Sequence, residues 1–159
     1  MTRRERVMAA LRGEPTDRVP VTAWRHFPQG DLTAAAHMES FTRFQRENDW
    51  DLMKMMFRNS FPLEDWGCTV GEEQVPYGYY LPETYAVREP ADWEKLEVLD
   101  PQAGTLGEMV EVVDAVRRRT ADDLLKLATV FCPLMVARQL GGERMLLLSI
   151  RARYTRRWR

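Results

Sequence analysis

Residues 4–21 read RERVMAALRGEPTDRVPV, and this stretch decides the fold. Thr2, which precedes the stretch, and Glu5, which lies within it, have the spacing of a capping box. In a capping box each of the two side chains binds a free backbone N–H at the start of the helix. Apolar residues then recur at helical spacing until a glycine and a proline end the pattern. Residues 19–24 follow as a predicted strand rich in β-branched side chains, and Pro20 favours its first or edge position. We therefore predict a helix that leads into a strand.

Farther along the chain, short apolar runs alternate with helical patterns. The spacing predicts a helix over 31–48, a strand over 52–57, a loop over 58–62, a hairpin with strands at 68–70 and 79–81, a short helix over 90–96, a helix over 106–119, a strand over 124–131 and a helix from Pro133. Repeated strand-then-helix units indicate an α/β fold with a parallel sheet. No glycine-rich phosphate-binding motif follows a strand, so nothing in the pattern supports nucleotide binding.

The composition is that of a globular protein. The chain has 159 residues, 45% of them hydrophobic and 30% charged, which is enough to bury a core. No apolar run approaches the roughly 18 residues of a membrane span. Cys68 and Cys132 lie far apart without a pairing pattern, which favours a reducing, cytoplasmic setting.

The charge is distributed unevenly. The last nine residues contain five arginines and no acid, whereas residues 1–150 contain 18 basic and 24 acidic residues, a formal charge of −6. An acidic body is a poor binder of polyanions, so we expect no nucleic-acid partner.

Three segments together resemble the uroporphyrinogen decarboxylase superfamily. Residues 4–21 are similar to the family's first helix and its entry into the first barrel strand. Asp51-Leu-Met-Lys54 resembles the second strand, and Thr129-Val-Phe-Cys-Pro-Leu-Met-Val-Ala137, followed by Gly141-Gly142, resembles the third strand and its helix.

The resemblance implies a (β/α)8 TIM barrel, of which this chain is expected to carry about three βα units with a hairpin insertion. Residues 1–147 are expected to form the N-terminal part of such a barrel, and the Arg-rich tail, 148–159, to lie outside the family pattern. A frameshifted or prematurely ended reading frame would explain both the incomplete barrel and the Arg-rich tail. We expect such a truncated chain to be inactive alone and to self-associate through open sheet edges.

The family's active site lies at the carboxyl ends of the strands, so the resemblance implies substrate-binding residues there. We expect Arg25, His26, Lys54 and Arg58 in this role, and we assign no catalytic residue. Arg25 matches the first arginine of the family's loop after strand one, and Arg58 stands near the position of the decarboxylases' strand-two aspartate. Each residue has a structural alternative: an ion pair for Arg25, a hydrogen-bonded loop histidine for His26, pairing with Asp51 for Lys54, and pairing with Glu64 or Asp65 for Arg58. His37 is expected to face solvent on its helix.

The family contains two chemistries. Its decarboxylases, which are carbon–carbon lyases, act on carboxylate-rich uroporphyrinogen without a cofactor. Its methyltransferases act on methylated corrinoids and use zinc held by His and Cys in the second half of the family pattern. We predict a decarboxylase-like protein of porphyrin biosynthesis with a carboxylate-rich, tetrapyrrole-like substrate, no metal ligands among these residues and no membrane partner. The alternatives are a corrinoid methyltransferase fragment, which alone would need corrinoid and zinc, and a small α/β binding module.

Overall fold

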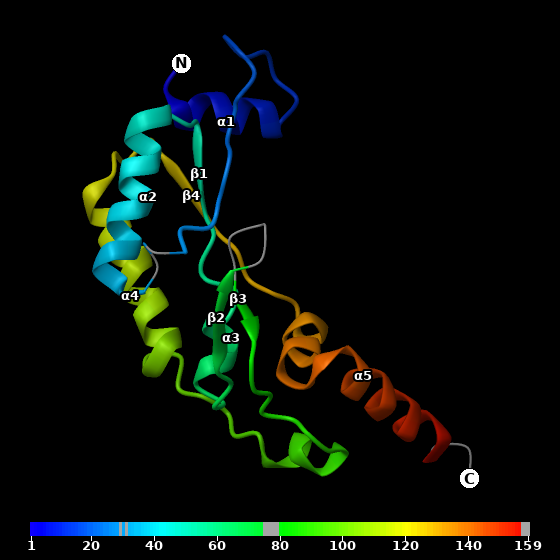
Figure 1. Ribbon diagram of the computed structural model, residues 1–159. Helices are drawn as coiled ribbons and strands as arrows, with labels where there is room; N and C mark the ends of the chain where they lie inside the picture. The colour runs from blue at the N-terminus through cyan, green and yellow to red at the C-terminus, as the bar shows by residue number, and fades with distance from the viewer. Residues whose placement is uncertain (29, 31, 75–79, 157–159) are drawn as a thin grey trace. The chain divides into compact units, whose positions relative to one another are not determined.

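The computed structural model describes residues 1–28, 30, 32–74 and 80–156, which divide into two compact units (Figure 1). Unit 1 comprises Met1–Arg58 and Glu108–Thr129, and unit 2 comprises Asn59–Gly107 and Val130–Arg159. Among the helices of the described residues, none combines the length and apolar character that crossing a bilayer requires.

Unit 1 begins with the predicted helix, α1 (Arg3–Leu11). Its capping box is present, with the Thr2 hydroxyl accepting from the Glu5 amide and the Glu5 carboxylate accepting from the Thr2 amide. The next predicted helix is α2 (Ala34–Asn48), which Thr33 caps through the amide of Ala36. Both helices start where the sequence places a hydroxyl at the N-cap.

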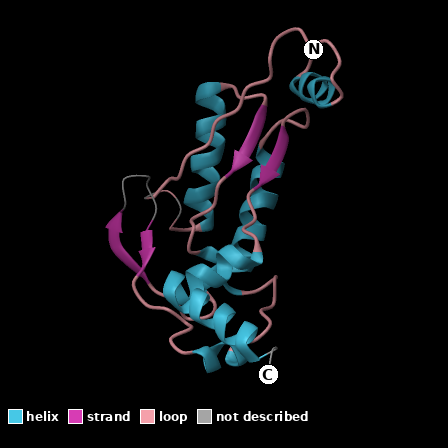
Figure 2. Cartoon of the chain, turned by 90° about the vertical axis from the view of Figure 1, so that its right-hand side faces the viewer, coloured by secondary structure: helices cyan, strands magenta, loops and turns pink. Residues whose placement is uncertain are grey.

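The sheet of unit 1 is a parallel pair. β1 (Leu52–Met55) pairs with β4 (Leu125–Ala128), with Leu52 opposite Leu125 and Met55 opposite Ala128. The helix α4 (Gly104–Arg119) comes before β4 along the chain. Figures 1 and 2 show α2 and α4 on one face of this strand pair. That face holds the core, whose buried side chains include Met38, Phe41, Met53, Met55, Val112 and Val116.

The prediction of a strand at 19–24 is wrong. This segment runs extended beside β1 without joining its ladder, and the described residues of this sheet form two strands. The Asp51 amide donates to the Val21 carbonyl, and the Val21 amide donates to the Asp51 carboxylate. The Thr22 hydroxyl donates to the Leu52 carbonyl. Pro20 has no N–H to donate to a neighbouring strand. After Pro20, the side chains of Asp51 and Thr22 make hydrogen bonds that a regular ladder would make between backbones, so no regular strand pairing forms. The mixed α/β class is confirmed, whereas a count of three βα units is not.

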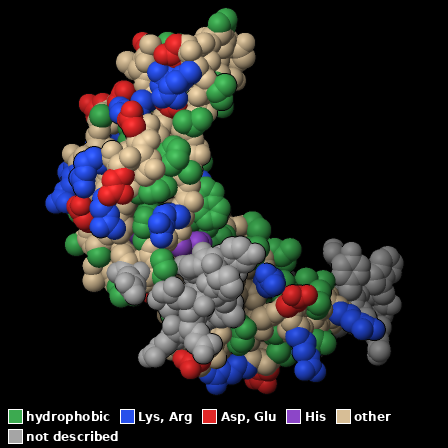
Figure 3. Space-filling model, turned by 45° about the horizontal axis from the view of Figure 1, so that its top comes forward, with side chains coloured by type: hydrophobic (Ala, Val, Ile, Leu, Met, Phe, Trp, Pro, Cys, Tyr) green, Lys and Arg blue, Asp and Glu red, His purple; other side chains and the backbone are tan. Residues whose placement is uncertain are grey.

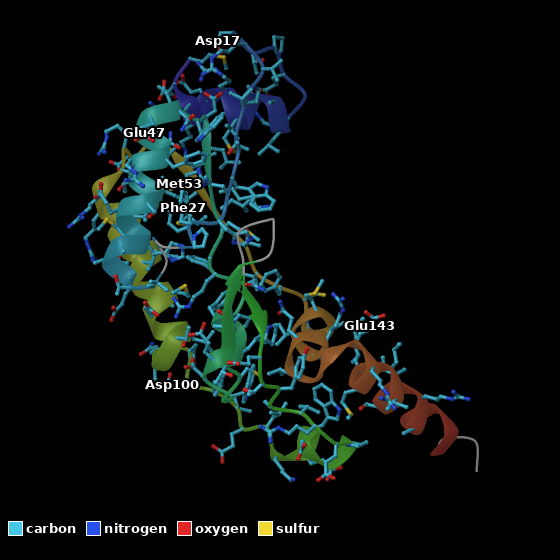
Figure 4. All side chains as sticks on the ribbon, viewed as in Figure 1. Asp17, Phe27, Glu47, Met53, Asp100 and Glu143 are labelled. Atoms are coloured by element: carbon cyan, nitrogen blue, oxygen red, sulfur yellow. The ribbon has the colours of Figure 1, made fainter. Side chains whose placement is uncertain are left out.

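A buried charge network explains the opening sequence. Asp51 is fully buried and accepts hydrogen bonds from Arg6 at 2.5 Å, from Arg18 at 2.5 and 2.8 Å, and from the Val21 amide at 2.9 Å. Arg6 also donates to Asp17 at 2.7 Å, and Figure 4 shows Asp17 beside α1. The Asp-Arg-Val stretch therefore ties α1 to the start of β1.

Unit 2 contains the predicted hairpin, with β2 (Val70–Gln74) antiparallel to β3 (Tyr80–Pro82). Tyr79, part of the second predicted strand, lies outside the described residues. The loop predicted over 58–62 is wrong at its end, where α3 (Phe61–Glu64) begins with Pro62 in its first turn. The short helix predicted over 90–96 is present as a 3-10 helix, η1 (Pro90–Lys95), with its proline in the first turn.

The last helix, α5 (Pro133–Arg156), contains a break at Gly142, whose φ of 74° suits glycine. It continues past residue 147. The core of unit 2 consists of the buried side chains of Leu63, Cys68, Val87 and Leu140.

Candidate functional site

The predicted site residues of unit 1 lie toward the carboxyl ends of its extended segments. Residues 24–27 follow the extended segment beside β1, and Arg58 lies three residues beyond the end of β1. The amide of Thr129, just after β4, donates to the Met55 carbonyl at 3.2 Å, so the two parallel strands end together. In α/β folds, this edge of a parallel sheet is where ligands bind.

Lys54 lies on the face of β1 opposite the helices. Side chains alternate along a strand, and the neighbours Met53 and Met55 are buried while Lys54 is half-buried. Figure 4 shows Met53 on the α2 side of β1. The Lys54 Nζ lies 4.5 Å from the centroid of the Trp24 ring. Its expected pairing with Asp51 is wrong, because the Asp51 carboxylate is occupied by Arg6 and Arg18.

Arg25 is exposed, and its guanidinium makes weak local contacts. Its Nε donates to the carbonyl of His26 at 3.2 Å, and the guanidinium carbon lies 5.5 Å from the ring centroid of Phe27. Among the residues that the structure describes, no carboxylate forms an ion pair with Arg25 or with Lys54. Both positive charges are therefore available to an anionic ligand.

Arg58 differs from these two cations. It forms a part-buried ion pair with Glu108 of α4, with an N–O distance of 2.8 Å. Glu108 was not among the expected partners. Asp65, which was, instead accepts hydrogen bonds from the amides of Thr105 and Leu106 at the start of α4. The pairing fixes Arg58 to α4 and neutralises much of its charge.

His26 is buried and meets the Trp24 ring edge-on, with centroids 5.8 Å apart. Burial lowers the pKa of His26, so the ring is neutral near pH 7. A neutral imidazole fits its expected role as a binding residue through hydrogen bonding rather than charge.

Sequence reasoning misplaced His37, which is fully buried and not solvated. Its ring stacks on Phe41 at 4.6 Å and meets Phe57 edge-on at 5.7 Å. Burial, helped by the positive charge of Arg58 and opposed by the Met56 backbone, lowers the pKa of His37 to about 4. Its spacing of four residues from Phe41 places both on one helical face, a signal that could have revealed its burial.

The site is cationic and aromatic, with half-buried aliphatic side chains. Figure 3 shows hydrophobic side chains gathered at the surface of unit 1, away from the charged outer surface of its helices. Within residues 1–28, 30, 32–74 and 80–156, no group of three or more His, Cys, Asp or Glu side chains could hold a metal ion. What the arrangement offers is two cations without a carboxylate partner among the described residues, beside the aromatic rings of Trp24 and Phe27.

Unit 2 has a cavity of its own between η1 and α5, with a volume of about 710 Å³. Trp93, Leu146, Ser149 and Ile150 are among its lining residues. None of the four predicted site residues lines it, so it is a separate feature.

Comparisons with known proteins concern the family and the fold of the chain. The family model of uroporphyrinogen decarboxylase (URO-D) matches residues 2–152. A methyltransferase from Methanosarcina mazei has a similar structure, with a TM-score of 0.74 and 18% sequence identity, over 93% of this chain and 48% of that chain. The chain thus spans about half the length of this solved structure, and at this identity the likeness concerns the fold. None of the curated proteins compared with the chain matches it.

Proposed function

The chain belongs to the uroporphyrinogen decarboxylase (URO-D) family, and from this premise we propose that it supplies the first βα units of an incomplete (β/α)8 TIM barrel. The parallel β1–β4 pair, with α2 and α4 on one face, supports this proposal. The extended segment 19–24 would take the place of the barrel's first strand, and the hairpin β2–β3 would be an insertion. The family match ends at residue 152, so residues 153–159 would lie outside the barrel pattern.

The ligand that we propose is a carboxylate-rich small molecule of the tetrapyrrole type. The observation that carries this proposal is the pair of cations, Lys54 and Arg25, that lie near the carboxyl ends of the extended segments without a carboxylate partner among the described residues. The nearby acid Asp51 is already bound by two arginines. A ligand with several carboxylates would supply the missing charges, and Arg25 can bind one of them in bidentate geometry.

We propose the carbon–carbon lyase chemistry of the family for the complete barrel, in a cytoplasmic setting and without a cofactor. A barrel's active site is built from loops after many strands, and this sheet has two strands among the described residues. The isolated chain is therefore expected to bind the ligand without turning it over. Its open sheet edges favour self-association, with a second copy as the partner.

The Methanosarcina mazei neighbour supports a second candidate, methyl transfer. That chemistry would use a corrinoid and zinc, and the described residues contain no cluster that fits the metal.

Ligand binding by the full chain tests the proposal. Uroporphyrin, the stable oxidised form of the carboxylate-rich tetrapyrrole, is titrated and followed by quenching of tryptophan fluorescence. We expect saturable binding that weakens as salt is added, because the contacts are between charges. Coproporphyrin, which has fewer carboxylates, should bind about tenfold more weakly or worse, since each lost charge-assisted hydrogen bond is worth about 1.5 kcal/mol or more.

Methylcobalamin serves as the comparison ligand. Binding of methylcobalamin without binding of uroporphyrin would overturn the decarboxylase-like proposal in favour of the methyltransferase. Binding of neither would leave the small α/β module as the better account of the chain.

A further inference from the structure

The face of the β1–β4 pair that α2 and α4 leave open carries one cation among apolar side chains. Lys54 stands opposite Leu127 across the ladder, and Leu52 stands opposite Leu125. Leu127 is 50% exposed. Parallel sheets normally have both faces covered, and in the proposed barrel this face would turn toward the interior.

Trp24 holds the Lys54 ammonium without neutralising it. The ring attracts the Lys54 Nζ, which lies 4.5 Å from the ring centroid. Because the ring carries no negative charge, the ammonium N–H groups can still donate hydrogen bonds to an anion. No acid among the described residues forms an ion pair with Lys54. The charge is thus positioned and still unsatisfied.

The Trp24 ring itself is held in place and is 48% exposed. His26 meets it edge-on, and just upstream the backbone of Val21 and the hydroxyl of Thr22 bind Asp51 and Leu52. A fixed, half-exposed indole offers its remaining surface to a single aromatic ring of a ligand, next to the Lys54 ammonium.

We propose that Lys54 and Trp24 form a binding site for an aromatic ring that carries a carboxylate, such as one pyrrole ring of a tetrapyrrole, with the Lys54 ammonium on the carboxylate and the ring beside the indole and the exposed leucine. This proposal rests on the proposed function and deepens it by naming the pair that binds one carboxylate-bearing ring of the ligand. Arg58 is excluded from the pair, because Glu108 already occupies its guanidinium.

The test compares variants of the full chain for binding of uroporphyrin. Lys54→Met, which keeps the length of the side chain and removes the charge, should weaken binding tenfold or more. Lys54→Arg should restore affinity to within about threefold of the wild type, a rescue that a purely structural lysine would not predict. Trp24→Leu should weaken binding and remove part of the fluorescence quenching.

Lys126→Met is the matched control. Lys126 lies on the neighbouring strand opposite Met53, and its ammonium donates to the carbonyl of Ala121 at 3.1 Å. Its replacement should leave affinity unchanged. Equal binding by the wild type and Lys54→Met, with both folded by circular dichroism, would overturn the proposed pair, whereas the saturable binding of uroporphyrin itself would still support the proposed function, with Arg25 as the remaining cation.

A smaller probe separates this proposal from the tetrapyrrole assignment. Trimesate, a flat benzene tricarboxylate, is titrated while the indole N–H signals are followed by NMR. If uroporphyrin fails to bind but trimesate shifts the Trp24 signal in the wild type and not in Lys54→Met, the pair is supported and the tetrapyrrole class is wrong. If neither probe binds, the pair is overturned as well.

Discussion

Replacing Asp51 with Asn is expected to lower the free energy of unfolding of unit 1 by about 3 kcal/mol, because it leaves buried cationic groups without their carboxylate. Asp51 is fully buried, and the Arg6 side chain beside it is only 9% exposed. Arg18 is 47% exposed and can be hydrated, and Arg6 keeps its ion pair with Asp17. We therefore expect a loss at the lower end of the about 3–5 kcal/mol that breaking a buried ion pair usually costs. Urea denaturation followed by circular dichroism measures the loss.

Asp49→Asn is the control for this prediction. Asp49 is 71% exposed and pairs with Arg3 at the surface, where an ion pair is worth less than about 1 kcal/mol. Equal destabilisation by the two variants would contradict the account of Asp51 as the buried centre of the network.

The stabilising contribution of Asp51 is expected to be lost only in strong acid, because its pKa is lowered in the folded protein. Burial alone would raise the pKa of Asp51, but hydrogen bonds from Arg18, the Val21 amide and Arg6 outweigh it and lower the pKa. A depressed carboxylate pKa contributes stability above the ordinary value of 3.8, and that stability is lost as the pH falls through the lower, folded-state pKa. The Asp51 contribution is therefore intact at pH 5.

His37 is expected to lower the free energy of unfolding by about 3 kcal/mol as the pH falls from 6.5 to 4. These limits are the ordinary pKa of histidine, 6.5, and the pKa of His37 in the folded protein, about 4. Over this interval the unfolded chain takes up a proton on His37 and the folded chain does not, so lowering the pH favours unfolding. His37→Phe preserves the stacking on Phe41 and removes the titrating group. Its unfolding free energy should fall less over the same pH interval.

His26 supplies the comparison for this second prediction. Burial lowers its pKa too, so His26→Gln should remove a separate part of the pH dependence and leave the His37 part in place. The Asp51 network acts at lower pH and does not obscure the comparison. If His37→Phe keeps the full pH dependence of the wild type, the burial of His37 does not control it.

Local signals predicted the local structure well. The capping box at Thr2 and the apolar spacing over 106–119 correctly predicted α1 and α4, because a helix is specified by its own residues. The strand run near 124–131 was also predicted, although β4 covers only Leu125–Ala128. The family resemblance, which rested on residues 4–21, 51–54 and 129–142 together, is confirmed.

Long-range contacts explain what the sequence could not predict. The 19–24 segment has strand composition, but Asp51 and Leu52, distant in sequence, take its hydrogen bonds through side-chain contacts. Arg58 pairs with Glu108, fifty positions away, although nearer acids were available as candidates. The contact of Lys54 with Trp24 likewise depends on how two distant segments lie together.

Hydrogen–deuterium exchange of the full chain with and without uroporphyrin tests the central claim most directly, because it locates the bound ligand. The account predicts new protection in residues 22–27 and 54–58, at the carboxyl ends of the extended segments of unit 1. Protection confined to the cavity between η1 and α5, or no protection at all, would contradict it.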